Sequence, residues 1–190
     1  AKVGYGTANE VRASAAFGGP IIEDTLFARI AGSFIDRDGH YKSITTGDFV
    51  DPYQEKIGRV RLIWTPSSRF TADFRAEISE TDGGATNFLS QSVIPGVSTD
   101  STFDGIVDAN DLRANFVTNV RNFNDREKRF ISLKWDYDFD FGTLTSTTSY
   151  DKNSDTFGSD DFPYLPSADS TQFNAKSHRA YTQEIRFSSP

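Results

Sequence analysis

The stretch from Phe130 to Tyr150 reads F-I-S-L-K-W-D-Y-D-F-D-F-G-T-L-T-S-T-T-S-Y. From Ile131 onward apolar and polar side chains alternate strictly, and this period of two predicts a long, half-buried β-strand. Gly142-Thr143 is expected to form a tight turn, and Leu144 to Tyr150 a return strand rich in threonine. The stretch therefore predicts an antiparallel hairpin with one apolar, aromatic face and one charged face. The apolar face would carry Ile131, Leu133, Trp135, Tyr137, Phe139 and Phe141.

Six further segments show the same alternation, and polar connections separate them. Gly18-Gly19-Pro20 is expected to end the second strand, and Thr65-Pro66-Ser67-Ser68 is expected to form a turn. The chain is therefore predicted to be all-β, an antiparallel up-and-down meander of about eight strands. The six segments are residues 3–5, 11–17, 26–34, 59–64, 70–78 and 181–187.

The composition excludes several classes of protein. The 190 residues include no cysteine, so neither a disulfide framework nor a thiolate metal site can form. The net charge of −7 argues against nucleic acid as the main partner. Aromatic residues make up 14%, too many for a disordered chain, although the mean hydropathy is only −0.50. No run of 18 apolar residues is present, so no transmembrane helix is expected.

Short connections alternate along the chain with long ones, which are residues 35–56, 79–129 and 151–180. In an up-and-down meander this places all long connections at one end. Outer-membrane barrels have this asymmetry, with short periplasmic turns and longer extracellular loops. We therefore expect the three long loops to face outward and to help capture a ligand. A soluble β-sandwich remains the alternative, because alternation alone does not distinguish lipid from a second sheet.

The two faces of the strands would have separate roles in a barrel. Full charges inside strands, such as Arg61, Asp73 and Lys134, would each cost a few kcal/mol against lipid but are acceptable in a polar lumen. Aromatic residues near strand ends would form girdles at the two membrane interfaces. The aromatic residues concerned are Trp64, Trp135, Tyr137, Phe139, Phe141 and Tyr150.

Several motifs, in the right order along most of the chain, resemble those of the TonB-dependent outer-membrane receptors. The early barrel strands of that family are similar to Gly18-Gly19-Pro20-Ile21 and to Asp36-Arg37-Asp38-Gly39-His40-Tyr41. Leu62-Ile63-Trp64-Thr65-Pro66-Ser67 resembles a strand that enters a periplasmic turn. The segments 141–150 and 184–190 resemble strands of receptors from alphaproteobacteria, and from sphingomonads in particular.

The resemblance implies that residues 1–190 are about eight strands of a larger transmembrane barrel, whose plug domain and remaining strands lie outside this sequence. Both ends of the sequence lie in or just after strands, so we expect a segment of a longer protein. Family members reside in the outer membrane of Gram-negative bacteria and take up scarce, bulky nutrients such as ferric siderophores, cobalamin or oligosaccharides. The implied partners are the plug, the remaining strands, membrane lipid, an extracellular ligand and the TonB complex. A non-transporting surface protein or an adhesion or binding module remains the alternative function.

The sequence gives no support for an enzyme. His40 and His178 are the only histidines, and both are expected in separate, solvent-exposed loops. No nucleophile elbow, phosphate-binding glycine loop or zinc-binding H-E-x-x-H motif is present. We therefore assign no catalytic residue and no organic cofactor, and the substrate-binding residues stay unassigned.

One segment carries a candidate metal site. Residues 100–111 read D-S-T-F-D-G-I-V-D-A-N-D, which follows the spacing of an EF-hand calcium loop with glycine at its sixth position. Threonine at the third position and aspartate instead of glutamate at the twelfth depart from the pattern, so an acidic surface loop is the alternative. The candidate calcium ligands are Asp100, Thr102, Asp104, Asp108 and Asp111.

Overall fold

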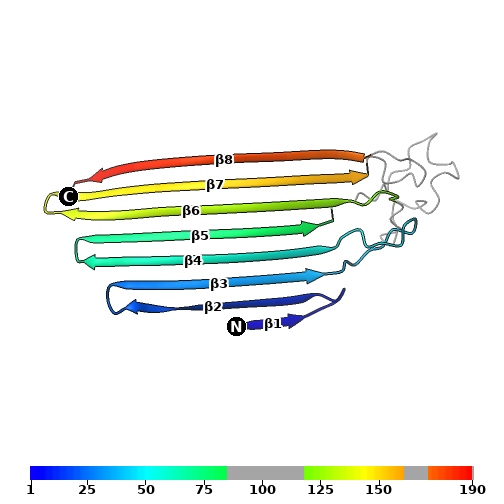
Figure 1. Ribbon diagram of the computed structural model, residues 1–190, viewed down its shortest axis with the longest axis horizontal. Coiled ribbons are helices and arrows are strands. Elements are labelled where there is room, and N and C mark those ends of the chain that lie inside the picture. Colours follow the sequence, from blue (N-terminus) through cyan, green and yellow to red (C-terminus); the bar gives the residue numbers. More distant parts are fainter. Residues whose placement is uncertain (85–117, 161–170, 190) are drawn as a thin grey trace.

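The computed structural model describes residues 1–84, 118–160 and 171–189, and these residues form one antiparallel sheet (Figure 1). Its eight strands lie side by side in chain order, which confirms the predicted all-β meander. The strands are β1 (Lys2–Tyr5), β2 (Val11–Ile22), β3 (Leu26–Arg37), β4 (Tyr53–Ser67), β5 (Phe70–Gly83), β6 (Phe123–Phe139), β7 (Gly142–Asp160) and β8 (Thr171–Ser188).

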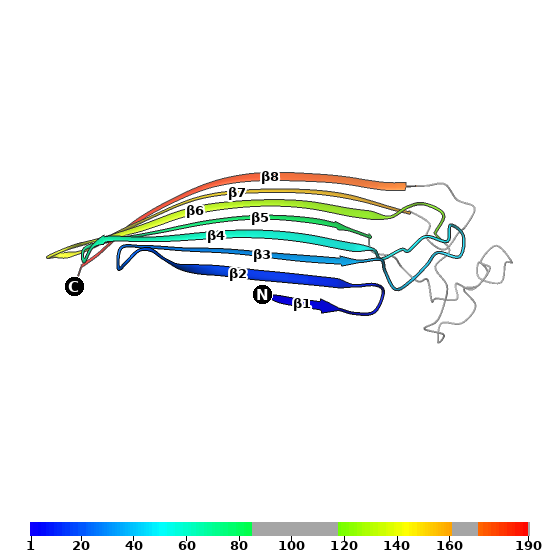
Figure 2. The same cartoon turned by 60° about the horizontal axis from the view of Figure 1, so that its bottom comes forward.

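The sheet is a single, bowed layer with no second sheet or helix packed on it in the described parts of the chain (Figure 2). Val50, in the connection between β3 and β4, is the one hydrophobic residue among the described positions that is buried. Large apolar side chains of the strands are exposed instead, including Phe17, Ile131 and Ile185. The apolar side chains of this single-layer sheet are therefore not buried in a hydrophobic core within the described residues.

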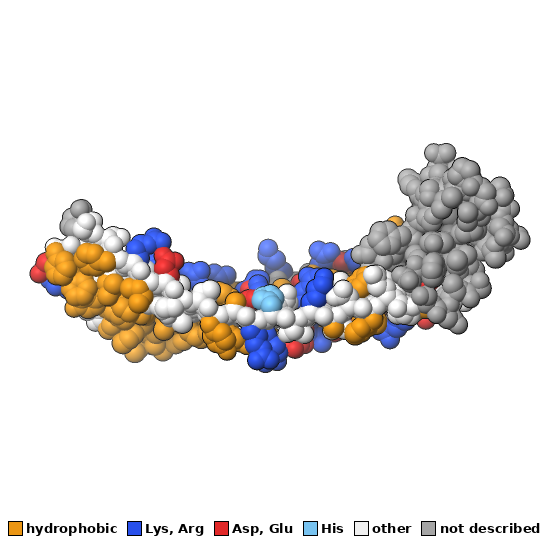
Figure 3. Space-filling view, turned by 90° about the horizontal axis from the view of Figure 1, so that it is seen from above, with side chains coloured by type: hydrophobic (Ala, Val, Ile, Leu, Met, Phe, Trp, Pro, Cys, Tyr) orange, Lys and Arg blue, Asp and Glu red, His pale blue; other side chains and the backbone are white. Residues whose placement is uncertain are grey.

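Strand register separates the side chains into two surfaces, because residues directly opposite each other on neighbouring strands point to the same side. Leu62, Phe74, Leu133 and Thr148 form one such row, and the other residues in register with them make up what we call the apolar face. The opposite side is the polar face. Figure 3 shows the sheet edge-on, with charged side chains along its hollow side and hydrophobic side chains on its bulging side. The predicted division of the hairpin at residues 130–150 into these two faces is therefore observed.

The ends of the strands differ from the sequence-based prediction, because all eight strands are longer than predicted. Gly18-Gly19-Pro20 does not end β2, since Pro20 still pairs with Phe27 and the strand continues to Ile22. The turn predicted at Gly142-Thr143 lies instead at residues 140–141, and Gly142 already pairs with Phe139.

The long connections are shorter than the predicted ranges 35–56, 79–129 and 151–180, because polar strand residues occupy much of them. The connections run over residues 38–52, 84–122 and 161–170. The strand ends that these connections join all lie at one end of the sheet, together with the turn between β1 and β2, and the short turns lie at the other end (Figure 1). In these polar segments the backbone still pairs with the neighbouring strands, although neither face is apolar, and the strands therefore continue through them. No helix in the described residues is long and apolar enough to cross a membrane.

Candidate functional site

The polar face carries rows of ion pairs that cross from strand to strand. Glu77 on β5 lies between Arg59 on β4, at 2.7 Å, and Lys128 on β6, at 3.7 Å. Nearer the loop end, Arg126 pairs with Asp155 at 3.4 Å. The carboxylates are less exposed than the cations that surround them, so the basic groups form the outermost layer of these rows. This surface can contact a polar or anionic neighbour through its partly exposed guanidinium and ammonium groups.

Asp73 is the centre of the tightest of these clusters. Its carboxylate accepts hydrogen bonds from Arg61, with Nη2–Oδ2 at 2.8 Å, and from Arg75, with Nη2–Oδ2 at 2.7 Å. Arg61 and Arg75 lie directly opposite each other on β4 and β5, so the two cations would repel without the shared carboxylate. The side chain of Asp73 is 16% exposed, whereas those of Arg61 and Arg75 are about half exposed.

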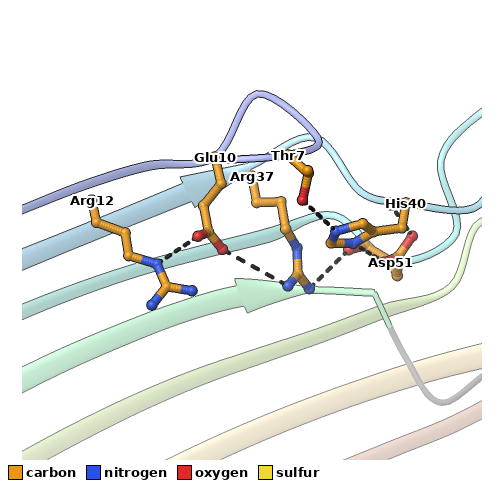
Figure 4. A network of polar contacts seen from close by, with 6 residues as sticks. All are labelled: Thr7, Glu10, Arg12, Arg37, His40 and Asp51. Carbon is orange, nitrogen blue, oxygen red and sulfur yellow. Dashed lines mark hydrogen bonds and ion pairs between the residues drawn. The ribbon is translucent and has the colours of Figure 1, made fainter. Parts of the chain in front are cut away.

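A second polar network forms a rim at the loop end of the sheet (Figure 4). Arg12 Nε donates to Glu10 Oε1 at 2.5 Å, and Arg37 approaches the other oxygen of Glu10 at 4.0 Å. Arg37 also lies over the ring of Tyr53, at 5.7 Å from its centroid. The Arg12 guanidinium, helped by the charge of Arg37, holds the pKa of the Glu10 carboxyl below its usual range. Glu10 therefore stays ionised and joins β1–β2 to the end of β3.

Asp51 organises the loop that follows β3. Its Oδ1 accepts the backbone N–H groups of His40 and Tyr41 at 2.8 and 2.9 Å, and its Oδ2 lies 3.3 Å from His40 Nδ1. Gly39 has a φ of 122°, and a Cβ there would come within 2.9 Å of the Asp51 carboxylate. Glycine is therefore required at this position, both for the backbone conformation and for the close approach of Asp51.

A small buried polar cluster joins the connection between β3 and β4, which carries part of the rim, to the loop ends of β6 and β7. Ser43 Oγ donates to the backbone oxygen of Thr118 at 2.5 Å, and Thr118 Oγ1 donates to Asp160 Oδ2 at 2.7 Å. Asn122 accepts the backbone N–H of Asp160 at 2.7 Å. Ser43 and Thr118 are almost fully buried. These bonds fix the connection after β3 against the segment before β6 and the end of β7.

The apolar face ends in aromatic residues at two levels. At the short-turn end Phe70 packs edge-on against Trp64 at 5.6 Å and stacks with Trp135 at 6.3 Å, measured between ring centroids. At the other level Tyr150 and Tyr181 face each other at 4.8 Å. Tyr150 lies in the middle of β7, away from the cluster of the other predicted girdle residues at the short-turn end. The aromatic residues therefore bound, on both sides, a band that is mainly apolar on β2 to β6 and includes the polar residues Ser146, Thr148 and Gln183 on β7 and β8.

The structure places the histidines differently from the prediction of two loop positions. His40 does lie in a connection, but His178 lies in β8, with its Nε2 2.8 Å from Asp151 Oδ1. Each histidine is next to one aspartate, and the described residues contain no group of three or more His, Cys, Asp or Glu side chains that could hold a metal ion. The rim around Asp51 and the ion pairs that join different strands had no local sequence signal, because their partners are far apart along the chain.

The predicted calcium loop lies outside the described residues. Its five candidate ligands therefore stay a prediction. These residues are Asp100, Thr102, Asp104, Asp108 and Asp111.

The chain is similar in fold to a section of a siderophore receptor of known structure. The crystal structure of the siderophore receptor PirA from Acinetobacter baumannii matches with a TM-score of 0.54 and 14% sequence identity. The match covers 94% of this chain and 24% of the receptor, so the chain spans about a quarter of the length of the protein it resembles. No family model matches the sequence. At this identity the likeness establishes the fold, an open eight-stranded section like part of a receptor barrel.

Proposed function

We propose that these residues are part of the transmembrane barrel of an outer-membrane receptor in a Gram-negative bacterium. The observation that carries the proposal is the apolar face, which is bounded by aromatic residues at two levels and has nothing packed on it in the described chain. From Ile131, which lies in the row of Tyr150 and Tyr181, to Phe139 at the short-turn end, strand β6 rises about 27 Å. At a tilt of about 40° this corresponds to about 20 Å across a membrane. An outer-membrane barrel has an apolar band of similar height, about 25 Å.

In this proposal the polar face lines the lumen. A sheet with open edges needs neighbouring strands, and in a large barrel the remaining strands would supply them. The ion-pair rows centred on Asp73 and Glu77 would then face a plug domain, and the rim around Glu10 and Asp51 would lie at the outer mouth. The protein would be a receptor without enzymatic activity, and residues 1–190 would form one partial domain.

The transported substrate is proposed from the sequence resemblance and from the fold. The receptor would take up a scarce, bulky nutrient, with a ferric siderophore as first candidate and cobalamin or an oligosaccharide as others, powered by the TonB complex. The assignment to an alphaproteobacterial lineage rests on the sequence motifs alone. Calcium at residues 100–111 is a further proposal for an outward-facing loop.

The first test is to extract the native polypeptide with detergent from cell envelopes and to measure its intact mass and location. We expect an outer-membrane protein several times larger than 21.1 kDa. A second measurement compares uptake of labelled ferric siderophores by cells with and without the gene, and by cells that lack TonB. Outer-membrane location without TonB-dependent uptake of any tested nutrient would favour the alternative, a surface binding or adhesion protein. A chain that is soluble without detergent would contradict the barrel.

A further inference from the structure

Beyond the tyrosine pair, the apolar face becomes basic on β7 and β8. Tyr150 lies opposite Tyr181, and the next pair in register on the same face is Lys152 and Arg179. Arg129 on β6 lies directly opposite Lys152, so three cations form one row across three strands. Figure 3 shows basic side chains projecting from the bulging side of the sheet near its middle. A row of cations here is unexpected, because the other charged rows in the middle of the strands lie on the polar face.

The row is not neutralised by neighbouring acids on β7 and β8. Arg129 pairs with Glu127, but no described acidic side chain forms an ion pair with Lys152 or Arg179. The following pair on the same face is Ser154 and Ser177, which adds two hydroxyl groups and no negative charge. The acidic residues of this face beyond the apolar band lie on β3, β5 and β6 and at the far end of β7, and they include Asp36, Glu80, Asp82, Asp125, Glu127 and Asp160.

The position of the row along the strands identifies its surroundings. It lies immediately on the loop side of Tyr150 and Tyr181, where aromatic side chains mark a membrane interface. Long basic side chains at this level can extend toward the lipid headgroups while their methylene groups stay in the apolar region. A cation at the interface costs about 0–1 kcal/mol, in contrast to its cost at the midplane, so the row is tolerated there.

We propose that Lys152 and Arg179, flanked by Arg129, bind the anionic headgroup of a lipid in the outer leaflet. The two cations sit side by side across the strands, the tyrosine rings lie beneath them toward the acyl chains, and the serine hydroxyls lie above them. Guanidinium and ammonium groups together recognise phosphate or carboxylate oxygens. This inference rests on the proposed membrane location of the apolar face.

The test uses the full-length protein that carries this segment. It is reconstituted into vesicles of equal parts phosphatidylcholine and phosphatidylglycerol, re-extracted in mild detergent, and its retained lipids are quantified by mass spectrometry. The expected result is enrichment of phosphatidylglycerol. Each unpaired cation contributes about fivefold to the binding of an anionic headgroup. The Lys152→Gln/Arg179→Gln variant should therefore lose roughly 30-fold of this preference.

Two control variants separate the site from general charge. Lys134→Gln/Lys176→Gln removes two cations from the polar face of β6 and β8, and we expect it to retain the wild-type preference. The charge-preserving variant Lys152→Arg/Arg179→Lys should also keep the preference. Equal phosphatidylglycerol retention by the wild type and the Gln variant would overturn the inference. Displacement of the retained lipid by inorganic phosphate would overturn it too, because the site would then recognise a free anion.

Failure of this inference can be told apart from failure of the proposed function. Insertion is first checked in vesicles of phosphatidylcholine alone, through protease protection of the folded protein. If the wild type does not insert, the membrane location is wrong and the headgroup site falls with it. If the wild type inserts but shows no preference for phosphatidylglycerol, the headgroup site alone is wrong.

Discussion

Tyr150 and Tyr181 lie opposite each other on β7 and β8 with their ring centroids 4.8 Å apart, and one pair further along the same face is Lys152 with Arg179. The change from aromatic to charged side chains thus occurs at the same row on both strands. Toward the short turns the same face of β8 continues with Gln183, Ile185 and Phe187, all exposed. In the proposed barrel, this pair of tyrosines would mark the level at which the lipid interior ends on β7 and β8.

The first prediction concerns which face meets lipid. Thr148→Arg places a cation on the apolar face, in the row of Leu133, and should lower the free energy of unfolding by about 2 kcal/mol. Ser149→Arg places the same cation on the polar face, where it should change stability by less than about 0.5 kcal/mol. Urea unfolding of the full-length barrel in vesicles measures both. Equal losses for the two variants would mean that the faces are wrongly assigned.

The second prediction concerns the cluster around Asp73. Asp73→Asn removes the charge shared by Arg61 and Arg75 and leaves two cations side by side, so it should destabilise the barrel by about 1–2 kcal/mol. The control is Asp140→Asn, because the Asp140 side chain is 83% exposed in its pair with Arg69. The control should be nearly neutral in the same unfolding assay. A neutral Asp73→Asn variant would show that the cluster contributes nothing to stability.

The third prediction tests the backbone at the turn between β6 and β7. Gly142 has a φ of 153°, and a Cβ there would come within 2.5 Å of the backbone oxygen of Ser188. Gly142→Ala should therefore cost about 1–3 kcal/mol. Gly19 has no heavy atom within 4 Å of its would-be Cβ, so Gly19→Ala should be neutral or slightly stabilising. The midpoint of thermal unfolding compares the two, and a matching loss for Gly19→Ala would contradict the steric explanation.

The fourth prediction concerns acid sensitivity of the β1–β2 hairpin. Arg12 lowers the pKa of Glu10 in the folded state, so the ionised carboxylate stabilises the hairpin above its ordinary pKa of 4.5. That stabilisation should be lost as the pH falls below 4.5 and through the lowered folded-state pKa. Amide hydrogen exchange at Gly6, whose N–H donates to the Glu10 carbonyl at 2.8 Å, should accelerate relative to the intrinsic rate in that range. In Glu10→Gln this pH-dependent change should disappear, and its persistence would assign the effect to another group.

The fifth prediction concerns residues 100–111. Asp104→Asn/Asp108→Asn removes two carboxylate ligands of the proposed calcium loop and should weaken calcium binding by at least about tenfold. Isothermal titration of the full-length protein measures the affinity. The matched control is Asp82→Asn/Asp125→Asn, which removes two carboxylates that lie opposite each other on β5 and β6. Unchanged calcium binding by the Asp104→Asn/Asp108→Asn variant would mean that residues 100–111 are an acidic surface loop that does not bind calcium.

The strand ends could not be predicted from local sequence, although the strand centres could. In β7 the segment from Asp151 to Asp160 has polar residues on both faces, so no period of two identifies it as a strand. It is a strand because its backbone pairs with β6 on one side and β8 on the other. The order of the eight strands could be predicted from the alternation and the turns. The polar ends of the strands could not, because they form only by pairing with strands that are distant in the sequence.

The sequence by itself determined the meander and the assignment of each strand residue to one of two faces, because side chains on a strand alternate whatever the partner. The tertiary structure alone decided which charges meet. Register brings Asp73 to Arg61 and Lys152 to Arg179, since pairing between strands fixes neighbours that no local pattern specifies. The fold of the connection between β3 and β4 brings Asp51 to His40. The ion pairs that cross the polar face and the basic row beside the tyrosines are consequences of that register.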